Sequence, residues 1–473
     1  MKKTKIICTM GPNTNDRNLM KALAENGMDI ARFNFSHGDY EEQKSRLDML
    51  KSIRDELDLP IAALLDTKGP EIRTGLLKDE KKVTLKEGQT YTLTTREIVG
   101  DDQIGFINYN GLPADVEAGN TILIDDGLIE LKVQEVVNGT DIVCTVVNGG
   151  ELGMRKGVNV PNVKIKLPAL TEKDKADIRF GIEQGFDFIA ASFVRTADAV
   201  REIRAMLDEA GSSIQIIAKI ENQQGVDNID SIIEAADGIM IARGDMGVEI
   251  PLEDVPVIQK DIIAKVYSAG KQVITATQML DSMIKNPRPT RAETTDVANA
   301  IYDGTSAVML SGESAAGKYP VEAVEMMAKI AERAEAAIDY KKNFFHYERA
   351  ANQNVTDAVC HAACTTAIDL NAAAVIIVTK SGVSARNISK YRPSCNIIAG
   401  TTSDKAYRQL NMSWGVTPVH LEEQNEVFTL FDHAVAAGKK QGLLQPGDKV
   451  VIGAGVPLGI SGNTNMLKVQ VVE

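Results

Sequence analysis

The segment IIAKIENQQG (residues 216–225) begins as an apolar strand and ends with charged and polar residues. Successive side chains of a strand alternate between its two faces, so Lys219 and Glu221 point to one side while Ala218 and Ile220 point to the other. Burying charges in a strand that otherwise belongs to the core costs several kcal/mol per ion. This cost indicates that the end of the strand serves a function.

Short apolar segments of this kind recur eight times, and most of them are followed by a helical pattern with a charged face. Strands that alternate with helices form parallel sheets, and eight such units predict a closed (β/α)8 barrel of the TIM type. The eight segments are residues 5–10, 29–35, 61–67, 188–193, 215–220, 238–243, 272–277 and 307–312.

Two stretches show a different pattern of apolar and polar residues; the first interrupts these units and the second follows them. Residues 71–168 show alternating strands and glycine-rich turns, which indicates a small β-barrel or sandwich domain inserted into the third unit. Residues 342–473 again alternate strands with helices and predict a mostly parallel open sheet. About 240 residues (1–70 and 169–341) remain for the barrel, close to the ~250 that such a barrel typically needs. The expected fold class is α/β, with three domains.

The net charge of −13 argues against nucleic acid and anionic membranes as partners, because both favour a basic surface. Five cysteines without a C-x-x-C pair suit free thiols in a reducing compartment. Cys360, His361 and Cys364 could hold a metal, but their helical spacing favours core packing. The sequence shows no membrane-spanning run and no signal peptide at its start, so we expect a cytoplasmic protein.

Polar and ionisable residues follow the predicted strands at their carboxyl ends. In barrels of this type the loops after the strands converge at one mouth, where the chemistry takes place. A purely structural mouth would carry mainly glycine, proline and neutral turn residues, so this concentration of charge favours an active site. The residues are Arg32, Asn34, Ser36, Asp66, Thr67, Lys68, Lys219, Glu221, Arg243, Gly244, Asp245, Thr277 and Glu313.

Glu221 and Asp245 stand at the ends of neighbouring predicted strands and can approach each other. Two carboxylates without a histidine or cysteine suit a hard divalent cation, Mg²⁺ or Mn²⁺, completed by substrate and water. The alternative is that Glu221 only pairs with Lys219 or Lys173. That alternative leaves the cost of placing charges near the barrel core unexplained.

The turn RGDMG (243–247) precedes a short acidic segment before the next helix. Its backbone N–H groups can attract an anion such as a carboxylate, and the Thr277 hydroxyl can reach the same place. Arg32, Arg73 and Lys219 supply positive charge around the metal, and guanidinium groups suit phosphate. A divalent cation, several basic side chains and no obvious nucleophile match phosphoryl transfer.

Asn34, Ser36, Asp66 and Thr67 form a second cluster, which offers only oxygen. A single carboxylate suits a monovalent cation better than a divalent one. A turn network of side-chain hydrogen bonds explains the same residues equally well, so the spacing alone leaves both interpretations open.

Seven segments together resemble the signatures of the pyruvate kinase family, in the order in which that family carries them. They are RFNFSHG (32–38), LLDTKGPEIRTG (64–75), KGVNVP (156–161), KIENQQG (219–225), ARGDMGVEIP (242–251), TATQMLDSMIKNPRPTRAE (275–293) and MLSGESAAGKYP (309–320). The C-terminal part resembles that family's C-terminal domain, so the resemblance covers essentially the whole chain. It implies transfer of a phosphoryl group from phosphoenolpyruvate to ADP, which gives pyruvate and ATP in glycolysis.

The resemblance also implies roles for individual residues. Mg²⁺ (or Mn²⁺) would be bound by Glu221 and Asp245, and the catalytic residues would be Lys219, Arg32 and Thr277. The substrate would contact Arg32, Lys219, Gly244, Asp245 and Thr277. K⁺ would be bound by Asn34, Ser36, Asp66 and Thr67, and the nucleotide by Asn34, Phe35, Ser36, His37, Arg73 and Lys156. Glu71, where potassium-independent relatives tend to carry lysine, implies K⁺ dependence. The inserted domain would close over the site as a lid and exclude water.

The segment TKSGVSAR (379–386) ends the first predicted strand of the C-terminal domain. Its hydroxyl and amide groups can cradle a phosphate, although an ordinary strand-to-helix turn explains the same residues. The resemblance favours an allosteric site for fructose 1,6-bisphosphate, or for AMP and ribose 5-phosphate, completed by residues 453–465. The expected effector ligands are Thr379, Lys380, Ser381, Gly382 and Ser384. Members of the family are usually homotetramers.

Two rival functions use parts of the same pattern. A metal-dependent aldolase or lyase acting on a pyruvate-like enolate would need the two carboxylates, but it would have less use for Lys219, the lid and the monovalent cation. A non-catalytic metabolite sensor would keep the effector site, but the intact metal and phosphate ligands argue against it.

Overall fold

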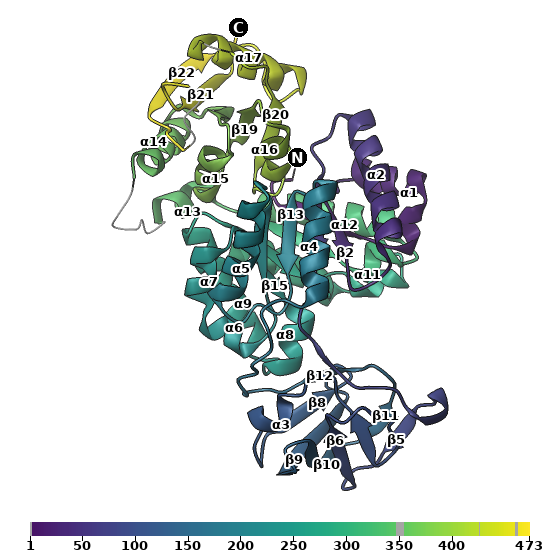
Figure 1. Cartoon of the computed structure of the whole chain (residues 1–473). Coiled ribbons are helices and arrows are strands. Elements are labelled where there is room, and N and C mark those ends of the chain that lie inside the picture. The colour runs from purple at the N-terminus through teal and green to yellow at the C-terminus, as the bar shows by residue number, and fades with distance from the viewer. Residues whose placement is uncertain (1, 347–353, 425, 459–461) are drawn as a thin grey trace.

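The computed structural model describes residues 2–346, 354–424, 426–458 and 462–473. Figure 1 shows three parts in a row, with the barrel in the middle, the C-terminal part at one end and the inserted part at the other. The domain boundaries expected at residues 71, 169 and 342 stay predictions. Among the described residues, none of the helices is both long and apolar enough to cross a bilayer.

The central part is a closed barrel of eight parallel strands, which confirms the predicted (β/α)8 fold. Each strand begins and ends within two residues of its predicted segment, because the apolar runs that mark the strands are also the residues buried in the barrel. The strands are β1 (Lys5–Met10), β2 (Ile30–Asn34), β3 (Ala62–Asp66), β13 (Phe188–Ala191), β14 (Gln215–Ile220), β15 (Gly238–Ala242), β16 (Gln272–Ala276) and β17 (Ala307–Leu310). Their order around the barrel is β1-β17-β16-β15-β14-β13-β3-β2.

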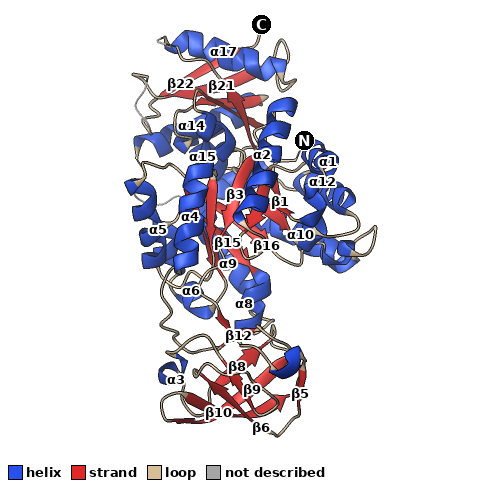
Figure 2. Ribbon diagram, turned by 45° about the vertical axis from the view of Figure 1, so that its right-hand side comes forward, coloured by secondary structure: helices blue, strands red, loops and turns tan. Residues whose placement is uncertain are grey.

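Helices cover the outside of the barrel (Figure 2). The Thr171 hydroxyl caps α4 (Glu172–Gln184) and the Thr290 hydroxyl caps α10 (Arg291–Asp303), each by accepting a backbone hydrogen bond from the third residue of its helix. Both helices end at a glycine with positive φ. The other helices around the barrel include α1 (Arg17–Glu25), α2 (Tyr40–Leu57), α5 (Ala197–Glu209), α7 (Ile229–Ala235), α9 (Val255–Ser268) and α12 (Pro320–Glu335).

The segment RGDMG was expected to form a turn, but it belongs to a short helix, α8 (Arg243–Glu249), which follows β15 directly. The Met246 side chain is fully buried beneath this helix, and its carbonyl oxygen accepts a hydrogen bond from Ile250 N at 2.9 Å. Burial of one apolar side chain outweighs the low helix propensity of the two glycines. The helix stops just before Pro251, as expected for a residue that precedes proline.

The inserted part is a small barrel built from a seven-stranded sheet in the order β4-β12-β8-β9-β10-β6-β7. Its edge strands meet, because Asn108 N donates to Arg73 O at 3.1 Å and Gly75 N donates to Phe106 O at 2.8 Å. The strands are β4 (Ile72–Arg73), β6 (Thr90–Thr94), β7 (Ile104–Phe106), β8 (Thr121–Ile124), β9 (Ile129–Val137), β10 (Asp141–Asn148) and β12 (Gly157–Asn159), with β5 (Val83–Leu85) and β11 (Gly150–Leu152) paired beside them.

The C-terminal part is an open sheet in the order β20-β19-β18-β21-β22, in which only the pair β21–β22 is antiparallel. Cys360 and Cys364 are fully buried in α14 (Val355–Leu370), which supports core packing for both. The strands are β18 (Ala374–Val378), β19 (Asn396–Thr401), β20 (Val416–His420), β21 (Lys449–Ala454) and β22 (Met466–Val471). The helices include α14 (Val355–Leu370), α15 (Val383–Lys390), α16 (Asp404–Leu410) and α17 (Val427–Lys440).

The C-terminal part packs on the floor of the barrel, at the amino ends of the strands. Met412 joins the apolar cluster inside the barrel. Around it, Arg408 Nε lies 2.9 Å from Asp187 Oδ1, and Lys5 Nζ donates to Val416 O at 2.7 Å. The mouth at the opposite end of the barrel therefore stays free to face the inserted part.

Candidate active site

The alternation of side chains in β14 places Lys219 and Glu221 inside the barrel mouth. Ile217 packs in the barrel interior, whereas Ile220 packs against the surrounding helices. Lys219 continues the inward-facing row and is 8% exposed. Its Nζ lies 3.0 Å from Asp66 Oδ1 and 3.0 Å from Glu221 Oε1.

Asp66 links this lysine to Arg32. Its Oδ2 accepts a hydrogen bond from Arg32 Nε at 2.6 Å, while its Oδ1 accepts one from Lys219. Burial tends to raise the pKa of Asp66, but the two cations outweigh burial and hold that pKa below its usual value. Burial tends to lower the pKa of Lys219, but Asp66 and Glu221 hold it above its usual value. Lys219 is therefore charged at neutral pH.

Glu221 directly follows β14, Asp245 lies in the first turn of α8 after β15, and their side chains lie next to each other. Burial raises the pKa of Glu221 to about 7, although Lys219 opposes this shift. Burial also raises the pKa of Asp245, whose carboxyl group is close enough to hydrogen-bond that of Glu221. In the described part of the chain, no group of three or more His, Cys, Asp or Glu side chains could hold a metal ion. A cation at these two carboxylates would need further ligands from substrate and water.

Thr277 has a strained backbone, with φ of 70° in the left-handed region that β-branched residues rarely adopt. Its hydroxyl accepts a hydrogen bond from Gly244 N at 2.7 Å and donates one to Ala276 O at 2.6 Å. Arg243 fixes the same turn, because its Nη2 donates to Thr277 O at 2.8 Å while the guanidinium pairs with Asp296 of α10. Strain of this kind concentrates at functional sites.

Two residues predicted to lie at the mouth, Arg243 and Glu313, form contacts within the protein that hold its loops. Arg243 pairs with Asp296 of α10, as described above. Glu313 is buried, and its carboxylate accepts backbone hydrogen bonds from Leu280 N at 3.1 Å and Ser311 N at 2.7 Å. Both side chains hold loops of the mouth together.

The oxygen-rich cluster lies where β2 and β3 end. Asn34 pairs with Asp66 in the strand register, and Asn34 Oδ1 accepts a hydrogen bond from Ser36 N at 3.0 Å. Thr67 O accepts one from the Ser192 hydroxyl at 2.6 Å. The side-chain turn network is thus present, and its oxygens lie beside the Arg32–Asp66–Lys219 group.

Arg73 ends β4 of the lid, as the inserted part is called from here on, and Lys156 lies directly before the adjacent strand β12. Arg73 Nε lies 2.7 Å from Glu71 Oε2, and Lys156 Nζ lies 2.9 Å from Asp125 Oδ1. Both cations are part-exposed. Glu71 is also near enough to help raise the pKa of Asp245, so this face of the lid points toward the mouth.

Two residues of the turn after β2 differ in exposure. His37 is exposed, and its carbonyl oxygen accepts a hydrogen bond from Gln43 Nε2 at 2.8 Å. Phe35 is buried, and its ring packs against Tyr40 and Phe180. A ligand at this turn could reach the backbone of Phe35 but not its ring.

Ser192 was missed by the sequence analysis. Its hydroxyl accepts a hydrogen bond from Lys219 Nζ at 2.8 Å and lies 3.2 Å from Asp66 Oδ1. The signal was available, because Ser192 is the polar residue near the end of the predicted strand 188–193, and it directly follows β13.

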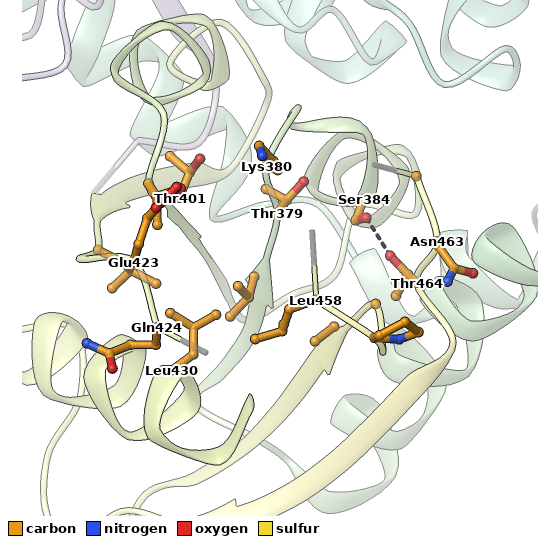
Figure 3. A pocket seen from close by; sticks show the side chains of 17 residues that line it. Thr379, Lys380, Ser384, Thr401, Glu423, Gln424, Leu430, Leu458, Asn463 and Thr464 are labelled. Carbon is orange, nitrogen blue, oxygen red and sulfur yellow. Dashed lines mark hydrogen bonds between the residues drawn. The ribbon is translucent and has the colours of Figure 1, made fainter. Parts of the chain in front are cut away.

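A second pocket, of about 440 Å³, opens at the carboxyl ends of the C-terminal strands (Figure 3). Thr379, Lys380 and Ser384 line it, and the Ser384 hydroxyl is hydrogen-bonded to that of Thr464 from the loop after β21. The loop 453–465 was predicted to complete this pocket, and several of its residues do line it. Residues 459–461 of this loop lie outside the described residues.

The remaining two predicted effector ligands, Ser381 and Gly382, are not among the residues that line this pocket. Gly382 has positive φ at the start of α15, and its N–H donates to Thr379 Oγ1 at 3.0 Å. Ser381 lines a separate cleft that faces the barrel floor.

Comparisons with known proteins agree with this architecture. Residues 1–324 match the family model "Pyruvate kinase, barrel domain", and residues 357–470 match "Pyruvate kinase, alpha/beta domain". The chain is 53% identical to a pyruvate kinase of Clostridium acetobutylicum, with both chains covered completely, and 50% identical to one of Staphylococcus epidermidis, of which it covers 81%. A solved pyruvate kinase structure from Cryptosporidium parvum superposes with a TM-score of 0.96 at 41% identity, covering all of this chain and 96% of the other.

Proposed function

The chain belongs to the pyruvate kinase family, and we propose that the residues around Lys219 carry out its reaction at the barrel mouth. Members of this family are glycolytic phosphotransferases that use phosphoenolpyruvate and ADP. The bond between phosphorus and the enol oxygen breaks, a bond to a terminal oxygen of ADP forms, and the enolate takes up a proton to give pyruvate. The observation that carries the proposal is the buried Lys219 ammonium between Asp66 and Glu221.

Lys219 and Arg32 stabilise the phosphoryl group as it moves between two oxygens. Phosphoryl transfer needs little covalent help from a protein and depends on positioning and on charge stabilisation. Both cations are already oriented by Asp66, so little reorganisation is needed when the phosphoryl group arrives. On the substrate side, Gly244, Asp245 and Thr277 surround the carboxylate of phosphoenolpyruvate.

The family uses a divalent cation and potassium, and the residues present fit both. Glu221 and Asp245 offer adjacent carboxyl oxygens, the donors that Mg²⁺ or Mn²⁺ prefers when substrate supplies the rest. A divalent cation held by these two carboxylates would neutralise negative charge on the phosphoryl oxygens. K⁺ would take the oxygens of Asn34, Ser36, Asp66 and Thr67.

The nucleotide occupies the space between the barrel mouth and the lid. Arg73 and Lys156 on the lid neutralise its phosphates, and the turn from Asn34 to His37, with Phe35 and Ser36 between them, bounds it on the barrel side. Asn159 Nδ2 of the lid donates to Glu249 Oε1 of α8 at 3.1 Å, so the lid is already in contact with α8, the helix that carries Gly244 and Asp245. Lid closure would exclude water that could otherwise accept the phosphoryl group.

The direct test is an assay with purified protein, phosphoenolpyruvate and ADP, in which pyruvate formation is coupled to lactate dehydrogenase. We expect turnover that requires a divalent cation and rises when K⁺ replaces Na⁺ at equal ionic strength. Absence of pyruvate formation under any cation combination would contradict the proposal.

Divalent cation binding should weaken below pH 7. The pKa of Glu221 is raised to about 7 by burial, so the carboxylate is ionised above that pH and increasingly protonated below it. A cation must displace this proton, and its affinity should therefore fall by up to about tenfold for each pH unit below 7. Calorimetric titration with Mn²⁺ between pH 5.5 and pH 8.5 measures this. A flat profile would show that no proton with a pKa near 7 competes with the cation at this site.

The C-terminal pocket is the proposed site of a phosphorylated effector. Hydroxyls of Thr379, Ser384 and Thr401 and the ammonium of Lys380 line it, which suits phosphate oxygens. Its volume of about 440 Å³ lies in the range of small-molecule sites. Fructose 1,6-bisphosphate and AMP or ribose 5-phosphate remain the two candidate classes.

Ser384→Glu should abolish activation by the effector and leave basal activity near normal. The added carboxylate would repel phosphate and would break the hydrogen bond between Ser384 and Thr464 that joins the two loops of the pocket. Activity at subsaturating phosphoenolpyruvate, measured against fructose 1,6-bisphosphate and against ribose 5-phosphate, tests this. Thr429→Glu, at a half-buried position of α17 that does not line the pocket, is a control that should keep the response. Unchanged activation curves for Ser384→Glu would place the effector elsewhere.

We also propose that the protein acts in the cytoplasm as a homo-oligomer, as expected for a tetrameric family. A groove of about 740 Å³ between α9 and α10 supports self-association, because it is flanked by the exposed apolar side chains of Val257 and Tyr302. Light scattering of the purified protein gives the number of subunits.

A further inference from the structure

A small cavity lies where the C-terminal part meets the barrel floor, at the end of the barrel opposite the mouth. It is bounded by the end of α9 and the start of β16 on the barrel side, and by the end of α15 on the other side. The cavity leaves about 10 Å³ for the centre of a water-sized particle, which is room for one such particle.

Four cations line this cavity, namely Lys271, Arg386, Lys390 and Arg392, and no carboxylate is among its lining residues. Lys390 pairs with Asp357 at 3.1 Å, outside the lining. Lys271 donates to backbone carbonyl groups at the end of α7. The Arg392 guanidinium donates to the backbone carbonyl oxygens of Gly304 and Thr305, and the Arg386 guanidinium donates to Ser381 O and is attracted by Asp237.

Arg392 is the most constrained of the four, at 9% exposure. Its Nη2 donates to Gly304 O at 2.7 Å, and its guanidinium lies 4.5 Å from the centre of the Trp414 ring. Its Nε is buried and has no hydrogen-bond partner in the described structure. Burial lowers the pKa of Arg392 to about 10, which expresses the cost of holding this charge away from water.

Gln272 faces the same cavity with a second unpartnered atom. Its Nε2 donates to Ser413 Oγ at 3.1 Å, while its Oε1 is buried without a donor. A half-turn of the amide exchanges the two atoms, so that Oε1 accepts from the Ser413 hydroxyl and the NH₂ group points into the cavity. The Gln272 amide then offers the cavity a second N–H donor, beside Arg392 Nε.

We propose that this cavity binds a single monatomic anion of the size of chloride, held by Arg392 Nε and surrounded by Arg386, Lys271 and Lys390. The charge of the lining favours an anion over water, because a buried donor on an unpaired cation gains most from a charged acceptor. A phosphate or sulfate ion is too large for the space.

The anion would join two separate parts of the fold. The residues around it come from the barrel floor and from the C-terminal part, including α15, whose second residue, Ser384, lines the effector pocket. A bound anion would therefore stabilise the docking of the C-terminal part on the barrel.

A crystal of the full-length protein grown or soaked in sodium bromide tests the site, because bromide is identified by its anomalous scattering. We expect an anomalous peak within hydrogen-bond distance of Arg392 Nε. A water molecule there in sodium bromide, without anomalous signal, would overturn the proposal.

A solution test compares thermal unfolding in sodium chloride with that in sodium gluconate at equal ionic strength, since gluconate cannot enter the cavity. We expect chloride to raise the midpoint by at least about 2 °C in the wild-type protein through binding linkage. Arg392→Gln should remove this difference, and Arg386→Gln, at a less buried position, should reduce it if the first variant does not fold.

Arg204→Gln is the matched control. Arg204 lies in the same region between barrel floor and C-terminal part, but it pairs with Asp237 and does not line the cavity. This variant should keep the full difference between chloride and gluconate. Equal midpoints in the two salts for the wild-type protein, or loss of the difference in Arg204→Gln alone, would contradict an anion at Arg392.

Discussion

Lys219→Met is expected to lower turnover by roughly 10³-fold or more, with a much smaller effect on binding of phosphoenolpyruvate. Loss of one cation that acts on a transferring phosphoryl group costs about 10³- to 10⁵-fold in related chemistry. Methionine fills a similar volume, so the barrel mouth should keep its packing. Steady-state kinetics that separate the turnover number from the Michaelis constant measure the effect.

The structure adds a second expectation for the same variant. The Lys219 ammonium opposes the rise in the pKa of Glu221, so its removal should raise that pKa further. The divalent cation should then bind more weakly at pH 7, and the activity of the variant should recover in part at higher pH or higher Mg²⁺ concentration. A loss of turnover that persists at saturating cation is the part due to phosphoryl transfer itself.

Lys173→Met is a suitable control. Lys173 also lies near the mouth, but its Nζ donates to Phe35 O at 2.9 Å and pairs with Asp177 of its own helix at 2.6 Å. It should retain turnover within a few-fold of the wild type. Near-normal turnover in Lys219→Met, with folding confirmed by circular dichroism, would refute the assigned role.

The barrel could be predicted because its strands carry the simplest signal in the chain. A strand buried on both faces requires an unbroken apolar run, and seven of the eight runs end at or beside a polar residue where the strand leaves the core. The same reasoning brought Glu221 and Asp245 to one place, since neighbouring strands end at the same edge. Only strand order and direction were needed for that inference.

Other features depend on contacts that sequence spacing does not encode. Arg243 stands at a strand end, where a basic side chain that binds substrate would be expected. Its partner is instead Asp296, on the helix that follows the next strand. Helix α8 forms because Met246 finds a buried site, which depends on packing and not on local propensity. The cavity beside Arg392 exists only after two parts of the chain have docked.

The most informative second variant is Glu221→Gln, which should weaken Mn²⁺ binding by at least about 100-fold and lower activity at fixed Mg²⁺ accordingly. The amide has the size of the carboxyl group but no charge, and it cannot supply an anionic ligand. Removal of a residue that only hydrogen-bonds a metal ligand typically lowers metal affinity 10- to 100-fold. Removal of the ligand itself should therefore lower the affinity for Mn²⁺ by more.

The variant should also remove the pH dependence of cation binding near pH 7, because the group that competes with the cation for a proton is gone. Glu249→Gln is the matched control: burial raises the pKa of Glu249 too, yet its carboxylate faces Asn159 of the lid. It should bind Mn²⁺ with wild-type affinity and keep the pH profile. If both variants bind Mn²⁺ normally, the cation is held by groups other than Glu221. If Glu249→Gln loses Mn²⁺ instead, Glu249 beside the lid is the ligand, and the carboxyl groups of Glu221 and Asp245 only share a proton.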